Sequence, residues 1–61
     1  MNGNYAAGMV MVRAWAAGWR AARTGAPETA CPYRWNAENA VERAQARMWL
    51  RGYDRGLGYH D

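Results

Sequence analysis

The stretch GAPETACPYRW, residues 25–35, divides this 61-residue chain into two parts. It contains both prolines of the chain and shows no helical repeat of apolar residues. Gly25 suits the C-terminal cap of a preceding helix, and Pro27 prevents that helix from continuing. Pro32 disfavours helical dihedral angles at Cys31. We therefore predict an ordered connector over residues 25–35, with one helix before it and one after it.

The first helix is predicted at about residues 4–24. At 100° per residue, its apolar positions share one side. They are Tyr5, Gly8, Met11, Val12, Trp15, Gly18, Trp19 and Ala22. Arg13 and Arg20 lie away from this stripe, and Arg23 lies at its edge. Gly8 and Gly18 fall on the apolar side, where a missing side chain lets another backbone or ring approach closely.

The second helix is predicted at about residues 36–55, with Asn36 as its N-cap and Glu38 in its first turn. Gly56 and Gly58 are expected to end it, which leaves residues 56–61 as a tail. Arg43, Arg47 and Arg51 form a row at i, i+4 and i+8, with no acidic residue expected among them.

A short pattern occurs in both halves of the chain. Trp15-x-x-Gly18-Trp19 and Trp49-x-x-Gly52-Tyr53 both read Trp-x-x-Gly-aromatic. We predict that the rings of each helix fill the glycine notch of the other. The fold class is therefore all-α: one domain, residues 1–61, of two helices in a hairpin-like arrangement around a Cys-Pro-Tyr connector. The candidate core and motif residues are Trp15, Gly18, Trp19, Gly25, Cys31, Pro32, Tyr33, Trp49, Gly52 and Tyr53.

Several function classes are disfavoured by composition. The single cysteine rules out an internal disulfide, and Cys31 with His60 is too few ligands for a structural zinc. The chain has no lysine for a phosphate-cradling loop, and its acidic residues show no spacing that implies a metal pair. We expect no enzyme activity, no metal, no cofactor and no membrane span, and we expect a cytoplasmic location. A core this thin makes a homodimer plausible.

Two residues of the connector allow two interpretations each. Cys31 is either a small side chain packed under the corner or a thiol made reactive by nearby Arg34. Tyr33 either packs on the first helix or, like Trp35, stacks on unpaired bases.

All eight basic residues are arginines, and the net charge is +3. Arginine presents a planar fork of donors that suits phosphate, although an alanine- and arginine-rich chain can also reflect a GC-rich genome. The charge fits an RNA or an acidic protein as a partner. The candidate RNA-binding residues are Arg13, Arg20, Arg23, Arg34, Trp35, Arg43, Arg47 and Arg51.

The order of these motifs resembles a known family. Ala14, Gly18, Trp19, Ala21, Gly25 and Cys31-Pro32-Tyr33 are followed by Trp49-Leu50, Gly52 and Tyr53. This is similar to the ribosome modulation factor family, with its Ala-x-x-x-Gly-aromatic-x-Ala, Gly, Cys-Pro-Tyr and Trp-Leu-x-Gly-aromatic elements. The resemblance covers residues 14–53, roughly two-thirds of the chain.

The resemblance implies a compact pair of helices that binds the small ribosomal subunit near the 3′ end of its RNA. It also implies repression of translation and ribosome hibernation. The same grouping includes CrpP-like proteins, for which a quinolone-modifying activity has been proposed. Two features differ from the family. The stretch from the connector to Trp49 is about two helical turns longer than in the short members. Residues 1–5 are uncharged, whereas the ribosome-binding members have a lysine-rich tail there.

The uncharged N-terminus keeps an alternative open. The chain is then a phage- or plasmid-encoded module that uses the same scaffold to bind a host protein. A CrpP-like enzyme is the remaining alternative, and the absence of a catalytic set disfavours it.

Overall fold

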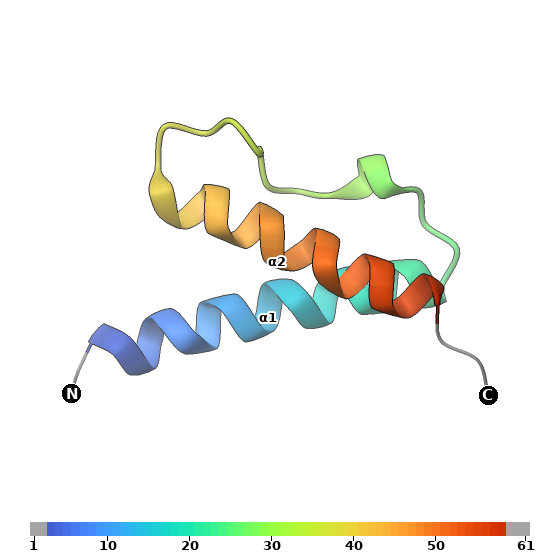
Figure 1. The fold of residues 1–61 in the computed structure, drawn as a ribbon, viewed down its shortest axis with the longest axis horizontal. Coiled ribbons are helices and arrows are strands. Elements are labelled where there is room, and N and C mark those ends of the chain that lie inside the picture. Colours follow the sequence, from blue (N-terminus) through green and yellow to red (C-terminus); the bar gives the residue numbers. More distant parts are fainter. Residues whose placement is uncertain (1–2, 59–61) are drawn as a thin grey trace.

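Three helical elements make up the computed structural model, which describes residues 3–58, with side chains from residue 8 onward. They are α1, Gly3–Arg23, a short 3₁₀ helix η1, Glu28–Ala30, and α2, Ala40–Leu57 (Figure 1). The described residues contain no strand. The predicted all-α fold of two packed helices is confirmed. Tyr5 of the predicted stripe and residues 59–61 of the predicted tail lie outside the described side chains.

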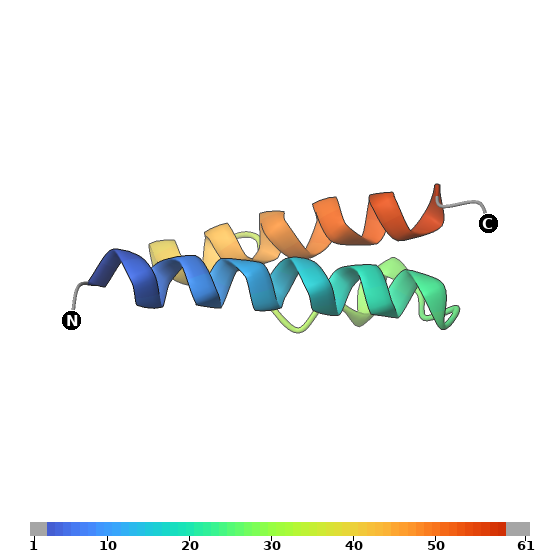
Figure 2. The same ribbon diagram turned by 90° about the horizontal axis from the view of Figure 1, so that it is seen from below.

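The two helices run in the same direction, because the connector travels back along α2 before α2 begins (Figures 1 and 2). The Tyr53 hydroxyl, in the last turns of α2, donates to the carbonyl of Ala26, just after α1, at 2.7 Å. The molecule measures 38 × 25 × 13 Å. It is therefore a slab with two broad faces. Neither helix is long and apolar enough, over the described residues, to cross a membrane.

α1 ends as the sequence predicts. Gly25 has φ +83°, a left-handed conformation that glycine adopts without strain. The N–H of Ala26 donates to the carbonyl of Ala21 at 2.9 Å, and the N–H of Gly25 donates to that of Ala22 at 3.2 Å. This pair of bonds is the Schellman motif, and it satisfies carbonyls that the last turn of a helix leaves without partners.

The predicted start of α2 is wrong. Its N-cap is Asn39, whose side-chain oxygen accepts from the N–H groups of Val41 and Glu42 at 2.7 and 3.3 Å. The predicted N-cap, Asn36, lies in a turn before it. The guanidinium of Arg43 donates to the carbonyls of Ala37 and Glu38, at 2.6 and 2.9 Å. Those carbonyls are thereby satisfied outside the helix, which delays its start.

The predicted end of α2 is wrong at Gly56, which is helical and buried. A Cβ on Gly56 would lie 2.7 Å from both the Ala22 Cβ and the Trp19 carbonyl oxygen. Packing against α1 therefore keeps this glycine in the helix. The helix ends one residue later, at Leu57, where the N–H of Gly58 donates to the carbonyl of Asp54.

The two copies of the Trp-x-x-Gly pattern meet at the centre of the helix pair. A Cβ on Gly18 would lie 1.9 Å from the Trp49 carbonyl oxygen, and one on Gly52 would lie 2.0 Å from that of Trp15. Backbone atoms, rather than the predicted rings, therefore fill each notch. The prediction of a close approach holds at Gly18 and is wrong at Gly8, where a Cβ would meet nothing within 4 Å.

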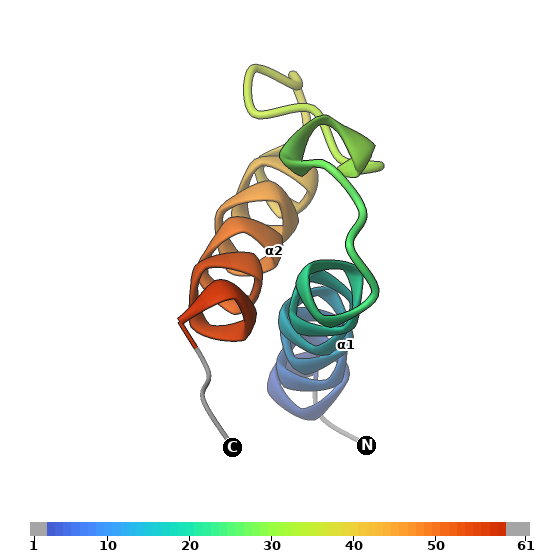
Figure 3. The same cartoon turned by 90° about the vertical axis from the view of Figure 1, so that its right-hand side faces the viewer.

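The reciprocal contact places equivalent side chains on opposite sides of the helix pair. Trp49 and Gly52 each lie 34 positions after Trp15 and Gly18, and two parallel right-handed helices related in this way form an approximate two-fold pair. The connector runs along α2, which lies between it and most of α1 (Figures 1 and 3). Trp49 and Tyr53 of α2 are 2% and 7% exposed, with their rings stacked at 5.2 Å. Trp15 and Trp19 are only half-buried.

Candidate nucleic-acid interface

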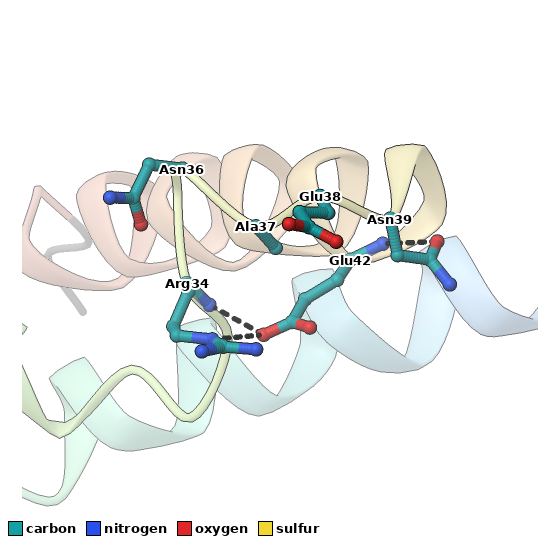
Figure 4. A pocket seen from close by; sticks show the side chains of 6 residues that line it. All are labelled: Arg34, Asn36, Ala37, Glu38, Asn39 and Glu42. Atoms are coloured by element: carbon teal, nitrogen blue, oxygen red, sulfur yellow. Dashed lines mark hydrogen bonds and ion pairs between the residues drawn. The ribbon is translucent and has the colours of Figure 1, made fainter.

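Three of the eight arginines have contacts within the fold. Arg43 binds the two carbonyls that precede α2. The Arg34 guanidinium lies 3.5 Å from the Glu42 carboxylate, and its backbone N–H donates to the same oxygen at 2.9 Å (Figure 4). The Arg23 guanidinium lies over the Trp19 ring, 5.9 Å from its centroid. These arginines, all candidates for RNA binding from the sequence, help to hold the connector or flank the helix pair.

Glu42 connects the connector to the first turn of α2. The hydrogen bond from the N–H of Arg34 lowers the pKa of the Glu42 carboxyl; desolvation opposes it, and the charge and side-chain hydrogen bond of Arg34 lower it further. The carboxylate is therefore the favoured partner of Arg34 at neutral pH.

A polar hollow of about 400 Å³ lies at this corner (Figure 4). Its lining residues are Arg34, Asn36, Ala37, Glu38, Asn39 and Glu42. Two carboxylates outnumber one guanidinium, which Glu42 already pairs, so the hollow does not suit a phosphate. Instead, Asn39 caps the first turn of α2, and Glu42 ties that turn to Arg34 of the connector.

The other five arginines are exposed, and their side chains form no hydrogen bond or ion pair within the described part of the chain. They are Arg13, Arg20, Arg47, Arg51 and Arg55. Arg47, Arg51 and Arg55, here called the α2 arginine row, follow one another at one-turn intervals, about 6 Å apart along the axis. Arg55 was missed from the sequence, although it continues the same i, i+4 spacing, because the helix was expected to end there.

The α2 arginine row, which differs from the predicted row by Arg55 in place of Arg43, has an acidic residue beside it. Asp54 is exposed and lies three positions after Arg51 and one before Arg55, on the same outer side of the helix. It forms no ion pair with any described residue. The uninterrupted cationic part of the row is therefore centred on Arg47 and Arg51.

The exposed arginines of α1 do not extend this row. Arg13 and Arg47 are 34 positions apart, so they occupy equivalent places in the approximate two-fold pair. Equivalent side chains project from opposite sides of the slab. The arginines therefore form two separate groups, with Arg13 and Arg20 on the outer side of α1 and the α2 arginine row on the outer side of α2.

The Cys-Pro-Tyr corner lies over α2 rather than α1. Cys31 and Tyr33 are half-buried and Pro32 is exposed. The Cys31 thiol donates to the Tyr33 carbonyl at 3.4 Å, which closes the corner on itself. Cys31 and Tyr33 also line a second hollow, of about 370 Å³, between the connector and the Ala46–Leu50 side of α2. Trp35 stands at its rim and is 76% exposed.

No three histidine, cysteine, aspartate or glutamate side chains of the described residues gather as a metal site. His60 lies outside those residues. Comparison of the chain with family models, with curated proteins and with solved structures gives no match.

Proposed function

We propose that this protein binds RNA through the outer side of α2, with the α2 arginine row contacting phosphates. The proposal rests on one observation: some arginine side chains are bonded within the fold, and others are not. Arg34 and Arg43 have partners within the fold, whereas the exposed guanidinium groups of the row have none among the described residues. A guanidinium binds two phosphate oxygens through parallel N–H bonds, so such a row suits a polyanion.

The proposed target is the small ribosomal subunit, with repressed translation or ribosome hibernation as the consequence. The sequence resemblance of residues 14–53 to the ribosome modulation factor family supports this choice. Gly18 and Gly52, two glycines of that pattern, form the contact between the helices, so the pattern belongs to the structure of the fold. The net charge of +3 is compatible with a ribosomal RNA surface.

A salt series tests the phosphate contacts. Three contacts to a single strand give a slope of about −2 in log affinity against log salt. Affinity for a fluorescent RNA, measured by anisotropy, should therefore fall roughly twenty-fold between 50 and 200 mM salt. An affinity that does not change with salt would contradict phosphate binding.

A pair of double variants locates the site. Arg47→Ala with Arg51→Ala removes two charges from the row, and Arg13→Ala with Arg20→Ala removes two charges from α1. Net charge falls equally in both, so long-range attraction falls equally. We expect the first to weaken RNA binding at least tenfold and the second less than about threefold. Equal losses would indicate non-specific attraction and would contradict the assigned site.

Sedimentation tests the target itself. The protein should travel with small ribosomal subunits in a sucrose gradient at low salt and be released as salt rises. If it stays at the top of the gradient at low salt while still binding free RNA, the ribosomal target is wrong and RNA binding remains.

A further inference from the structure

Trp35 is a large apolar side chain that the fold holds out in solvent. Its ring is 76% exposed, although the backbone on both sides is fixed. The N–H of Arg34 donates to Glu42 at 2.9 Å, and the carbonyl of Arg34 accepts from the N–H of Ala37 at 3.3 Å. The backbone that carries the ring is therefore in place before a ligand binds, so the ligand does not have to order it.

The hollow beside Trp35 has the size and lining of a small ligand site. Its volume of about 370 Å³ lies at the lower end of the range for small-molecule pockets. Trp35 and Tyr33 contribute aromatic rings, and Ala46 and Leu50 of α2 contribute apolar surface. Flat, partly apolar ligands that stack on aromatic side chains fit such a lining.

The polar residues of the hollow are hydrogen-bond acceptors rather than cations. Glu28 contributes a carboxylate and Thr29 a hydroxyl, both on η1. A carboxylate accepts from an exocyclic amino group, as in its pairing with the N4 amino group of cytosine. It repels a phosphate. The hollow itself therefore suits a base, and a phosphate would have to lie outside it.

The α2 arginine row lies beside the hollow. Arg47 precedes Leu50 of the lining by three positions, so the two residues are neighbours on the helix surface. Arg51 follows Leu50 and lies one turn further on. A strand with one base in the hollow would thus have its backbone beside guanidinium groups. Charge complementarity selects a nucleic acid as the occupant.

We propose that this hollow receives one unpaired nucleobase with an exocyclic amino group, stacked on Trp35, while Arg47 and Arg51 contact the adjacent phosphates. This inference rests on the proposed RNA binding and restricts it to single-stranded RNA. In an RNA duplex the bases are stacked and paired, so no base can enter the hollow. Glu28 makes cytosine a better occupant than uracil.

The test compares eight-nucleotide oligocytidine, oligouridine and a duplex of the same length, by fluorescence anisotropy at one salt concentration. The wild-type protein should bind oligocytidine most tightly and the duplex least. Trp35→Ala should weaken oligocytidine binding about tenfold or more, as expected for one lost stack, and leave duplex binding within twofold. Trp35→Phe keeps a ring and should restore most of the affinity. Since Trp35 is exposed, circular dichroism should show an unchanged fold.

A second variant tests the recognition of the amino group. Glu28→Ala should abolish the preference for oligocytidine over oligouridine, a ratio that is independent of the charge it removes. If Trp35→Ala binds oligocytidine like the wild type, or the duplex binds as tightly as the single strand, the base site is wrong and RNA binding stands. If no RNA binds the wild-type protein, the proposed function is wrong, and the base site with it.

Discussion

The two copies of the Trp-x-x-Gly-aromatic pattern make the same contact and have different surroundings. Gly18 meets the backbone of Trp49, and Gly52 meets the backbone of Trp15. Trp49 and Tyr53 lie on α2, which packs between α1 and the connector, and are almost fully buried, whereas Trp15 and Trp19 of α1 are half-buried. The same short pattern therefore provides the helix contact twice, while the position of the connector decides which pair of rings becomes the core.

This difference also separates two kinds of aromatic residue in the chain. The Tyr53 ring stacks on Trp49, and its hydroxyl binds Ala26, so all its groups serve the fold. Trp35, on the connector itself, covers little and stays exposed. In a slab with so thin a core, exposing one large ring has a substantial cost in burial. In the proposed base site, this exposed ring is the one that stacks on the RNA.

The largest expected loss of stability comes from removing the buried ring of Trp49. Trp49→Ala should destabilise the protein by about 3–5 kcal/mol, as for other buried large side chains, which is comparable with the whole stability expected of so small a domain. Trp15→Ala, at the equivalent half-buried position, should cost less than half as much. Thermal unfolding followed by circular dichroism measures both. Equal losses would mean that the connector does not distinguish the two halves.

The second-largest loss of stability should come from disturbing the contact between Gly18 and the Trp49 backbone. Gly18→Ala introduces a Cβ where the Trp49 carbonyl oxygen now lies, and the helices must separate to admit it. We expect a loss of about 3 kcal/mol in the free energy of unfolding. Gly8→Ala is the matched control in the same helix, with open space around the new Cβ, and should stabilise by up to about 1 kcal/mol. A Gly18→Ala protein as stable as the wild type would disprove the backbone contact.

The hydrogen bond that ties the connector to α2 should have a smaller effect. Tyr53→Phe keeps the ring and removes the hydroxyl that binds the Ala26 carbonyl. We expect a loss of about 1 kcal/mol, measured by urea unfolding. Tyr33→Phe changes the tyrosine of the connector, whose hydroxyl forms no hydrogen bond within the described residues, and should be neutral. A larger loss for Tyr33→Phe would contradict this assignment.

The smallest effect should come from the Glu42 corner and should depend on pH. The pKa of Glu42 is lowered below its ordinary value of 4.5, so its contribution is present above that pH and is lost as pH falls through the folded-state value. The melting temperature of the wild type should exceed that of Glu42→Gln at pH 7, and the gap should close in acid. A gap that is constant from pH 7 to pH 3 would show that the charge of Glu42 plays no part.

The ends of the elements show where sequence reasoning was sufficient. The end of α1 was predicted because Gly25 and Pro27 act locally, through backbone conformation alone. The start of α2 was not predicted correctly, because two asparagines, Asn36 and Asn39, are equally good N-caps when each is considered alone. The hydrogen bonds of Arg43 to the preceding carbonyls belong to the folded corner, and they favour the later asparagine.

The candidate interface shows the same division. Periodicity placed Arg43, Arg47 and Arg51 in one row, since the spacing of a helix is a property of the sequence. It could not tell that Arg43 binds carbonyls while Arg47 and Arg51 stay exposed. Nor could it tell that Arg13 and Arg20 lie on the other side of the slab. Both facts depend on how the elements pack.

By itself, the sequence determined that two helices flank an ordered connector and that Gly18 and Gly52 lie at the contact, because dihedral preferences and helical period act within a few residues. Only the tertiary structure decided that the helices are parallel, that backbone rather than rings fills the notches, and that the connector covers Trp49 and Tyr53. These features depend on contacts between residues far apart in the chain. The connector is long enough to return along α2, and its path sets which rings are buried and which arginines remain exposed.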